Sequence, residues 1–320
     1  LSPVPNSVFW ISATYNRISD LSGLSDNSNL SGLWLRGNLI SDISPIVGLP
    51  NLSSLGIELN QIDRLDQIPN TLFALYAGEN PLDDADLLDL ADNVNLGALD
   101  LSNTQVTDLS PLAGLKQLSV INYGCSQVSD ISVLAGLQNL QIVTLWGAPL
   151  DSVLPLSGLP ISGLNLDDTG ITELPALTPE LDWLTARNNQ ISDISALAVS
   201  LPTLQTLDLD NNHITLLPDL SGLTAMGAFR INNNAITDFS NLAQLPGSAF
   251  VQSDENRPEL GSVVVSSNVV DLDVNNCIDV TVNYNTNPFG DPFGNVNFIG
   301  PVSDGEYGAG FLDGSPTTLC

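Results

Sequence analysis

The sequence has very few basic residues. Seven lysines and arginines stand against 36 aspartates and glutamates, and Lys116 is the only lysine. The formal net charge of -29 repels phosphate backbones and anionic lipid headgroups, and no basic patch interrupts it. We therefore expect neither nucleic acid nor a membrane surface as a partner. Such a surface also suits a protein that works in salty surroundings, where exposed charges are screened.

Residues that trade protons, attack a substrate or hold a metal are also scarce. His213 is the only histidine, and it lies in "NNHI", where we expect an exposed turn. The sequence has no nucleophile with a neighbouring base, no glycine-rich phosphate loop and no metal-ligand spacing. Asp208 and Asp210 share one face, and two carboxylates can hydrolyse a glycosidic bond, but nothing sets this pair apart from ordinary polar residues. The sequence predicts a non-catalytic protein without a cofactor or a metal.

Long apolar runs are absent, and cysteines are few. No run approaches the roughly 18 residues of a membrane-spanning helix, so we expect no membrane insertion. Of the three cysteines, Cys125 is expected to be a small buried residue within a repeat, whereas Cys277 and Cys320 could pair near the C-terminus. Such a bridge would favour an oxidising compartment.

What the sequence does contain is one motif, repeated eleven times at intervals of about 22 residues. The motif has the form L-x-x-L-x-L-x-x-N-x-I-x-D and is clearest between Leu30 and Leu49. The positions aligned with its asparagine are 16, 38, 60, 80, 104, 126, 148, 169, 189, 212 and 234. In each repeat, L-x-L predicts a short strand with its leucines pointing inward. Because no repeat can bury its apolar face alone, the strands are expected to stack into one parallel sheet.

The motif and the stretches "NLISDISPIVGL", "TQVTDLSPLAGL" and "SQVSDISVLAGL" resemble the 22-residue class of leucine-rich repeats found in bacterial internalins. The resemblance covers residues 6–246, about three quarters of the chain. It implies an α/β solenoid, curved, with a parallel β-sheet on the concave side and short 3-10 helices and turns on the convex side. It also implies a bacterial protein, secreted or at the cell surface, that binds or adheres to a partner. Internalins carry a helical cap before their repeats, whereas only residues 1–7 precede the first repeat here, so we expect either a minimal cap or further sequence upstream.

Two polar positions of the motif are predicted to be structural. The asparagine amide can satisfy backbone groups that the turn after the strand would leave unpaired. Four central repeats replace it with Thr104, Ser126, Ala148 and Thr169, and there we expect looser or rearranged turns. Four residues after this position, an aspartate is expected to cap a short helical turn. This ladder comprises Asp20, Asp42, Asp84, Asp108, Asp130, Asp193 and Asp238. The alternative role is calcium binding, but one carboxylate per repeat falls short of the roughly six to eight oxygens that calcium prefers.

The last part of the chain has a different composition. One step beyond Asn234, Val251 and Ser253 suggest a degenerate twelfth repeat. The runs that follow, such as "IDVTVNY" and "NVNFIG", are rich in β-formers and separated by turn residues. We therefore predict a solenoid over residues 1–256 and a small β-rich cap over residues 257–320. The stretches "GDPFGN" and "DGEYGAGFLDG" match no calcium loop and are interpreted as turns.

The residues that the motif directs to the concave face have an unusual composition. All four tryptophans and three of the seven basic residues fall on such positions, which make up about a tenth of the chain. Tryptophan, tyrosine and arginine dominate binding hot spots. The predicted binding residues are Trp10, Trp34, Arg36, Tyr76, Asp100, Trp146, Asp167, Trp183, Arg187, Asp208, Asp210 and Arg230. The alternative is that wide rings only cover neighbouring small residues such as Gly32, Gly56 and Ala74.

Three hypotheses about function follow. The first is protein recognition by a monomeric, secreted or surface-displayed module, through two concave patches toward the two ends of the sheet. The second is polysaccharide binding by the concave Trp and Tyr rings. It predicts weak, salt-tolerant binding, whereas a protein interface with desolvated charges is more sensitive to charge substitution. The third is an intracellular scaffold, against which a disulfide bond would count.

Overall fold

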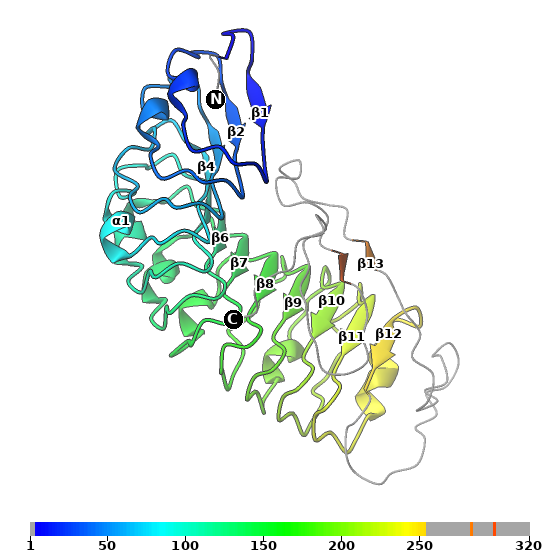
Figure 1. Cartoon of the computed structure of the whole chain (residues 1–320). Helices are drawn as coiled ribbons and strands as arrows, with labels where there is room; N and C mark the ends of the chain where they lie inside the picture. The colour runs from blue at the N-terminus through cyan, green and yellow to red at the C-terminus, as the bar shows by residue number, and fades with distance from the viewer. Residues whose placement is uncertain (1–3, 254–281, 284–296, 299–320) are drawn as a thin grey trace. The chain divides into compact units, whose positions relative to one another are not determined.

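The computed structural model describes residues 4–253, 282–283 and 297–298. Twelve short strands form one parallel sheet in chain order, so that each strand pairs with the strand of the next repeat. They are β1 (Trp10–Ser12), β2 (Gly32–Trp34), β3 (Ser54–Gly56), β4 (Ala74–Tyr76), β5 (Ala98–Asp100), β6 (Val120–Asn122), β7 (Ile142–Thr144), β8 (Gly163–Asn165), β9 (Trp183–Thr185), β10 (Thr206–Asp208), β11 (Ala228–Arg230) and β12 (Phe250–Gln252). The repeats form the predicted solenoid, and the sheet lines its concave side (Figure 1).

The core runs through the solenoid between the sheet and the convex side. The middle residue of each strand points into it, and so does the residue directly after the strand; Leu33 and Leu35 are both fully buried. Strand register aligns Leu33 with Ile11 on one side and with Leu55 on the other. Each repeat therefore buries its apolar residues against those of its neighbours, as a stacked array requires.

The asparagine ladder joins neighbouring repeats. The Nδ2 of Asn38 donates to the carbonyl of Leu35 in its own repeat (2.8 Å) and to that of Ala13 in the preceding repeat (2.9 Å). Its Oδ1 accepts from the N–H of Ile18 in the preceding repeat (2.9 Å). One side chain thus satisfies three backbone groups that the turn would otherwise leave unpaired, as predicted.

The turn after each strand keeps one left-handed residue in all eleven repeats. The residue before the asparagine position always has a positive φ, between 48° and 72°. The four repeats without asparagine keep it, at Asn103, Cys125, Gly147 and Asp168. Around this residue the four repeats differ from the others, because they form a hydrogen-bonded turn at 102–103, 124–125, 146–147 and 167–168 where the asparagine repeats have a bend. The predicted local rearrangement is therefore present. Two of the replacements preserve one bond of the ladder: the hydroxyls of Thr104 and Thr169 donate to the carbonyls of Leu101 (2.7 Å) and Leu166 (2.8 Å).

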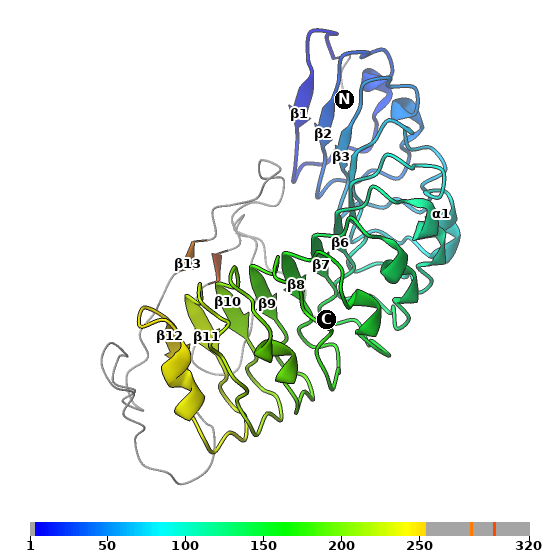
Figure 2. The same ribbon diagram turned by 180° about the vertical axis from the view of Figure 1, so that it is seen from behind.

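The convex side consists of short helices, as the resemblance implied (Figure 2). The 3-10 helices are η1 (Ser22–Leu24), η2 (Ser44–Ile46), η3 (Ser110–Gly114), η4 (Ser132–Gly136), η5 (Leu154–Leu156), η6 (Ser195–Ala198) and η7 (Ser240–Gln244), and the one short α-helix of the described residues is α1 (Asp84–Leu88). None of the helices in the described part of the chain is long or apolar enough to cross a membrane.

The aspartate ladder has the predicted structural role, with one exception. Six of its members accept the backbone N–H of the serine two residues later, at 2.8 to 2.9 Å. This hydrogen bond to Ser132 holds the pKa of Asp130 below its usual value. The exception is Asp84, which lies inside α1 and accepts the N–H groups of Thr107 (2.6 Å) and Asp108 (2.9 Å) in the next repeat.

A second compact unit, Asp271–Cys320, contains the antiparallel pair β13 (Val282–Asn283) and β14 (Asn297–Phe298). Both strands fall in the runs "IDVTVNY" and "NVNFIG", in which strands were expected. The predicted boundary after residue 256 and the predicted pair Cys277 and Cys320 lie outside the described residues.

Candidate functional site

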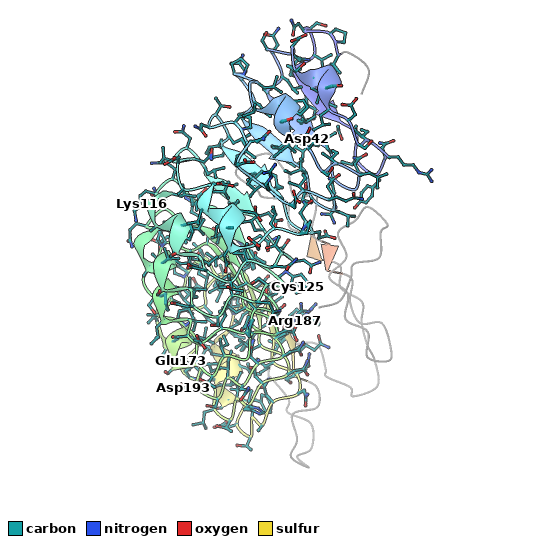
Figure 3. The ribbon with its side chains drawn as sticks, turned by 60° about the vertical axis from the view of Figure 1, so that its left-hand side comes forward. Asp42, Lys116, Cys125, Glu173, Arg187 and Asp193 are labelled. Carbon is teal, nitrogen blue, oxygen red and sulfur yellow. The ribbon has the colours of Figure 1, made fainter. Side chains whose placement is uncertain are left out.

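Three rows of side chains, here called lanes, face away from the core along the sheet. The first lane holds the first residue of each strand, the second lane holds the third residue, and the third lane holds the residue two positions after the strand. Strand register aligns Trp10 with Gly32 in the first lane and Ser12 with Trp34 in the second. All twelve predicted binding residues fall on these lanes. In Figure 3, Arg187 lies on the sheet side, and Lys116, Glu173 and Asp193 lie on the opposite side.

The twelve residues differ widely in exposure. Trp10 is 51% exposed, whereas Tyr76 is 3% exposed. Asp100, Asp167 and Asp208 are also buried, although they belong to the outward lanes. The remaining seven are partly exposed. The repeat pattern thus gave the direction of each side chain, but neighbouring side chains in the lanes cover several of them.

Each of the four tryptophans lies over a glycine of an adjacent strand or lane. A Cβ atom at Gly32 would collide with the ring of Trp10, and one at Gly56 with the ring of Trp34. On later repeats, Gly124 lies under Trp146 and Gly163 lies under Trp183. Trp10 and Trp34 lean toward later repeats, and Trp146 and Trp183 lean toward earlier ones. The alternative that these rings cover small residues therefore has direct support.

The N-terminal patch comprises Trp10, Trp34, Arg36 and Tyr76. The ring centroids of Trp10 and Trp34 are 5.8 Å apart, and those of Trp34 and Tyr76 are 5.2 Å apart. The rings are tilted by 37° and 32° and form a continuous aromatic surface that crosses β1 to β4. This aromatic surface is exposed at the Trp10 end and buried at the Tyr76 end.

Arg36 is surrounded by groups that the sequence did not single out. Its Nη2 donates to Glu79 Oε1 (2.6 Å), its Nε donates to the Tyr15 hydroxyl (2.9 Å), and its Nη1 lies 3.9 Å from Glu58 Oε1. Glu58 is a third-lane residue, so the lane rule alone would have found it. Glu79 has a positive φ in the turn after β4. Nothing in the sequence at this position indicates that its side chain lies near Arg36.

Glu58 is a buried acid with incomplete compensation. Burial raises the pKa of Glu58 to about 8, and the charge of Asp100 adds to the effect while Arg36 opposes it. Within the described part of the chain its Oε2 is buried and has no hydrogen-bond partner. Around this patch one arginine therefore faces three carboxyl groups, those of Glu58, Glu79 and Asp100.

The C-terminal patch comprises Asp167, Arg187, Asp208, Asp210 and Arg230. Asp167 accepts the backbone N–H of Arg187 (2.7 Å) and its guanidinium Nη2 (2.7 Å) and Nε (3.0 Å). Arg230 Nη1 lies 3.7 Å from Asp208 Oδ2. Aspartate and arginine side chains alternate along the sheet, so each arginine has a carboxylate in the neighbouring repeat.

Burial affects two carboxyl groups of this patch, those of Asp208 and Asp210. Burial raises the pKa of Asp208 above its ordinary value, and the charge of Asp210 adds to the effect. Burial also raises the pKa of Asp210, although Asn232 donates to it from its backbone N–H (2.6 Å) and its side-chain amide (3.0 Å). No general acid, base and nucleophile set surrounds this pair among the described residues, so the arrangement resembles a charged binding surface more than a catalytic centre.

Other predicted features fall outside the concave face or differ from expectation. His213 is exposed in its turn. Cys125 is partly exposed and disulfide-bonded, which corrects the expectation of a buried apolar residue. The described residues bring together no group of three or more His, Cys, Asp or Glu side chains that could hold a metal ion.

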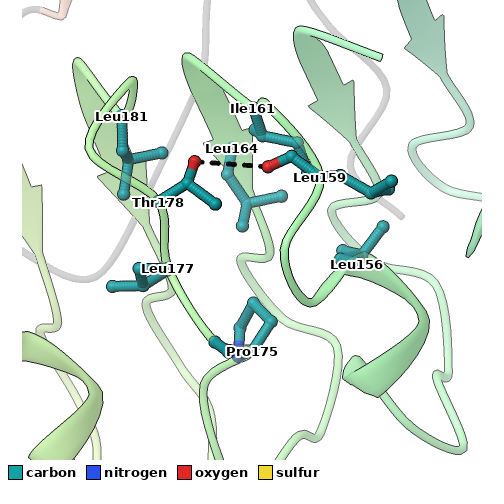
Figure 4. A pocket seen from close by; sticks show the side chains of 9 residues that line it. Leu156, Leu159, Ile161, Leu164, Pro175, Leu177, Thr178 and Leu181 are labelled. Carbon is teal, nitrogen blue, oxygen red and sulfur yellow. Dashed lines mark hydrogen bonds between the residues drawn. The ribbon is translucent and has the colours of Figure 1, made fainter. Parts of the chain in front are cut away.

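A small apolar cavity lies between two repeats inside the solenoid (Figure 4). It is lined by leucines such as Leu156 and Leu164, and Thr178 closes one side by donating to the Leu159 carbonyl at 3.2 Å. With space for about one water molecule at most, it is a packing defect and not a ligand site.

Comparisons with known proteins identify the repeats. A family model described as "Leucine Rich repeats (2 copies)" matches residues 179–223. An internalin from Listeria monocytogenes is 26% identical, with a TM-score of 0.70, over 78% of this chain and 74% of that one. A leucine-rich-repeat protein of Leptospira interrogans is 22% identical, with a TM-score of 0.70, over 79% and 69% of the two chains.

A more distant similarity extends to plants. The leucine-rich-repeat ectodomain of a membrane receptor kinase from Arabidopsis thaliana, solved in complex with Casparian strip integrity factor 2, is 17% identical with a TM-score of 0.56, over 76% of this chain and 35% of that one. No curated protein sequence matches this chain.

Fold and comparisons together define the class: a leucine-rich-repeat solenoid, a kind of binding scaffold, with no catalytic family indicated. Within that class, its repeats resemble those of internalins.

Proposed function

We propose that this chain is a non-catalytic module of a secreted or cell-surface bacterial protein, and that it recognises a partner protein through the N-terminal patch of its concave face. The observation that carries the proposal is the surface formed by Trp10, Trp34 and Tyr76 beside Arg36. Large rings next to a partly desolvated arginine are the usual composition of a protein-binding hot spot. The excess of carboxyl groups around Arg36 and the overall charge of -29 favour a partner with a basic surface.

The compartment is part of the same proposal. The disulfide bond of Cys125 supports an oxidising environment and counts against an intracellular scaffold. The similarity to an internalin also supports a secreted or cell-surface location, because the two chains share the repeat type over most of their lengths.

The test is a binding assay with matched variants. The full chain is immobilised and exposed to surface-protein extracts, and a retained protein is purified and titrated against the wild type. Trp10→Ala and Arg36→Ala should each weaken binding by about tenfold or more. Leu216→Ala is the control, because Leu216 is 70% exposed and lies outside the lanes. A retained protein that binds all three variants as tightly as the wild type contradicts the N-terminal patch as the site.

A further inference from the structure

The middle of the concave face differs from both patches because it lacks charge. The lanes of β6 and β7 carry Val120, Asn122, Gly124, Ile142, Thr144 and Trp146, none of which is ionisable. On β8 the only ionisable lane residue is Asp167, which is bound to Arg187. We call the lanes of β6 to β9, without the Asp167 and Arg187 pair, the central section.

A row of neutral polar side chains runs along the second lane here. Strand register aligns Asn122, Thr144, Asn165 and Thr185 from β6 to β9. Adjacent strands are about 4.8 Å apart, so the row extends for roughly 14 Å along the solenoid. It therefore presents one uncharged hydrogen-bonding group per strand at a regular spacing.

Several of these groups have unused hydrogen-bonding capacity. Asn165 accepts the N–H of Asp167 with its Oδ1 (2.9 Å), and its Nδ2 has no partner within the described residues. The partly exposed Thr144 hydroxyl also makes no hydrogen bond there. Thr185 is 3% exposed, and its buried hydroxyl has no partner among the described residues. Buried polar groups are normally satisfied, so the Thr185 hydroxyl is an unused hydrogen-bonding group in the same row as the partly exposed Thr144 and Asn165.

Two indole rings flank the row on opposite sides. Trp146 belongs to the third lane and lies over Gly124, and Trp183 belongs to the first lane and lies over Gly163. Both are partly exposed. Each ring therefore packs on a glycine and keeps part of its apolar surface exposed beside the polar row. A glycine is required under each ring, because a Cβ there would displace it.

Flat rings beside uncharged hydroxyl and amide groups match the chemistry of sugars. A sugar ring has an apolar face that packs on an aromatic ring and hydroxyl groups that both donate and accept hydrogen bonds. A protein interface usually places Arg among its aromatic residues, and the lanes of β6 to β9 hold a single arginine, Arg187, which is bound to Asp167. A regular row on a repeating sheet also suits a polymer that repeats the same unit. We propose that the central section binds a neutral polysaccharide chain that runs along the solenoid across β6 to β9.

The proposal goes beyond protein recognition and rests on different residues, so the two can fail separately. The full chain is run in native gels that contain a neutral glucan, a neutral galactomannan, dextran or the anionic polygalacturonate. At least one neutral polymer should retard the wild type, and retardation should persist in about 0.5 M NaCl because no charge pair is involved. Trp146→Ala and Trp183→Ala should each lower the affinity about tenfold, and Thr144→Val by a few-fold.

Matched controls separate binding from folding. Trp10→Ala should leave retardation unchanged, and Trp183→Phe should keep most of it, because a phenyl ring still offers a flat face. Far-ultraviolet circular dichroism and the urea midpoint report the fold of each variant. The proposal is overturned if no neutral polymer retards the wild type, or if Trp146→Ala, Trp183→Ala and Thr144→Val all bind as the wild type does. If these variants instead impair binding of a partner protein alone, the central section belongs to the protein interface.

Discussion

The two ends of the concave face use the same lanes for different kinds of surface. In the N-terminal patch three rings contact one another and a single arginine faces three carboxyl groups. In the C-terminal patch acid and base alternate from strand to strand, and Asp167 holds both the backbone and the guanidinium of Arg187. One patch therefore has an excess of carboxyl groups next to an exposed ring, and in the other each arginine has a carboxyl partner within the chain.

The difference follows from which residues face each other across adjacent repeats. A lane residue meets the same lane of the next repeat at about 4.8 Å, so residues of opposite charge such as Asp208 and Arg230 come together. Gly32 and Gly56 remove side chains from intermediate positions, and the rings on either side can then meet. We infer that the N-terminal patch is suited to a partner and that the C-terminal patch mainly stabilises the sheet.

The largest expected difference between the patches is in how far the free energy of unfolding falls when an arginine is replaced. Arg187→Leu should lower the free energy of unfolding by about 3 kcal/mol, because it leaves the buried carboxylate of Asp167 without its cation. Arg36→Leu should cost about 1 kcal/mol, because Glu79 remains accessible to water and Glu58 can hold a proton. Urea unfolding followed by circular dichroism measures both. Adding Asp167→Asn to Arg187→Leu should recover part of the loss, and equal losses for the two arginines would remove the distinction.

A second difference is in how stability depends on pH. A buried acid with a raised pKa binds its proton more tightly in the folded state, so its contribution falls as pH rises from the unfolded pKa to the folded one. For Glu58 that interval runs from about 4.5 to about 8. Each such group changes the slope of the free energy of unfolding against pH by at most about 1.4 kcal/mol per pH unit. Glu58→Gln should therefore flatten the fall in stability up to about pH 8. Asp208→Asn, whose pKa is also raised by burial, should flatten it at lower pH.

The measurement for this prediction is the urea midpoint of the wild type and both variants at intervals from pH 5 to pH 9. Asp130→Asn is the opposite control, since a hydrogen bond lowers the pKa of Asp130 and its replacement should not flatten the fall between neutral and alkaline pH. Parallel curves for the wild type and Glu58→Gln would mean that Glu58 is ionised throughout and that Arg36 compensates it fully.

Much of the fold could be predicted because the repeat imposes it. The period fixes the strands, the inward leucines and the ladder at Asn38, since these depend only on position within a repeat. It also assigns every predicted site residue to a lane. At Ala148 the missing amide correctly indicates a different turn, although the left-handed residue before it, Gly147, is kept.

Exposure and pairing within the lanes could not be predicted from the period. Tyr76 is buried because Trp34 reaches across Gly56, a contact that depends on rotamers and on the glycine between them. Glu79 meets Arg36 although it stands 43 residues later, because two intervening turns bring the repeats together. The position of Glu58 could have been predicted, because Glu58 lies two residues after its strand, as Arg36 does.

The smallest expected effect concerns the accessibility of the rings and barely involves stability. Trp10→Phe should change the free energy of unfolding by less than about 1 kcal/mol, because Trp10 is 51% exposed. It should nevertheless remove more of the acrylamide-quenchable tryptophan emission than Trp183→Phe, because Trp183 is only partly exposed beside the paired charges. Equal losses of quenchable emission from the two variants would mean that both ends of the face are equally open. The N-terminal patch would then have no advantage in accessibility, and its excess of carboxyl groups alone would distinguish it.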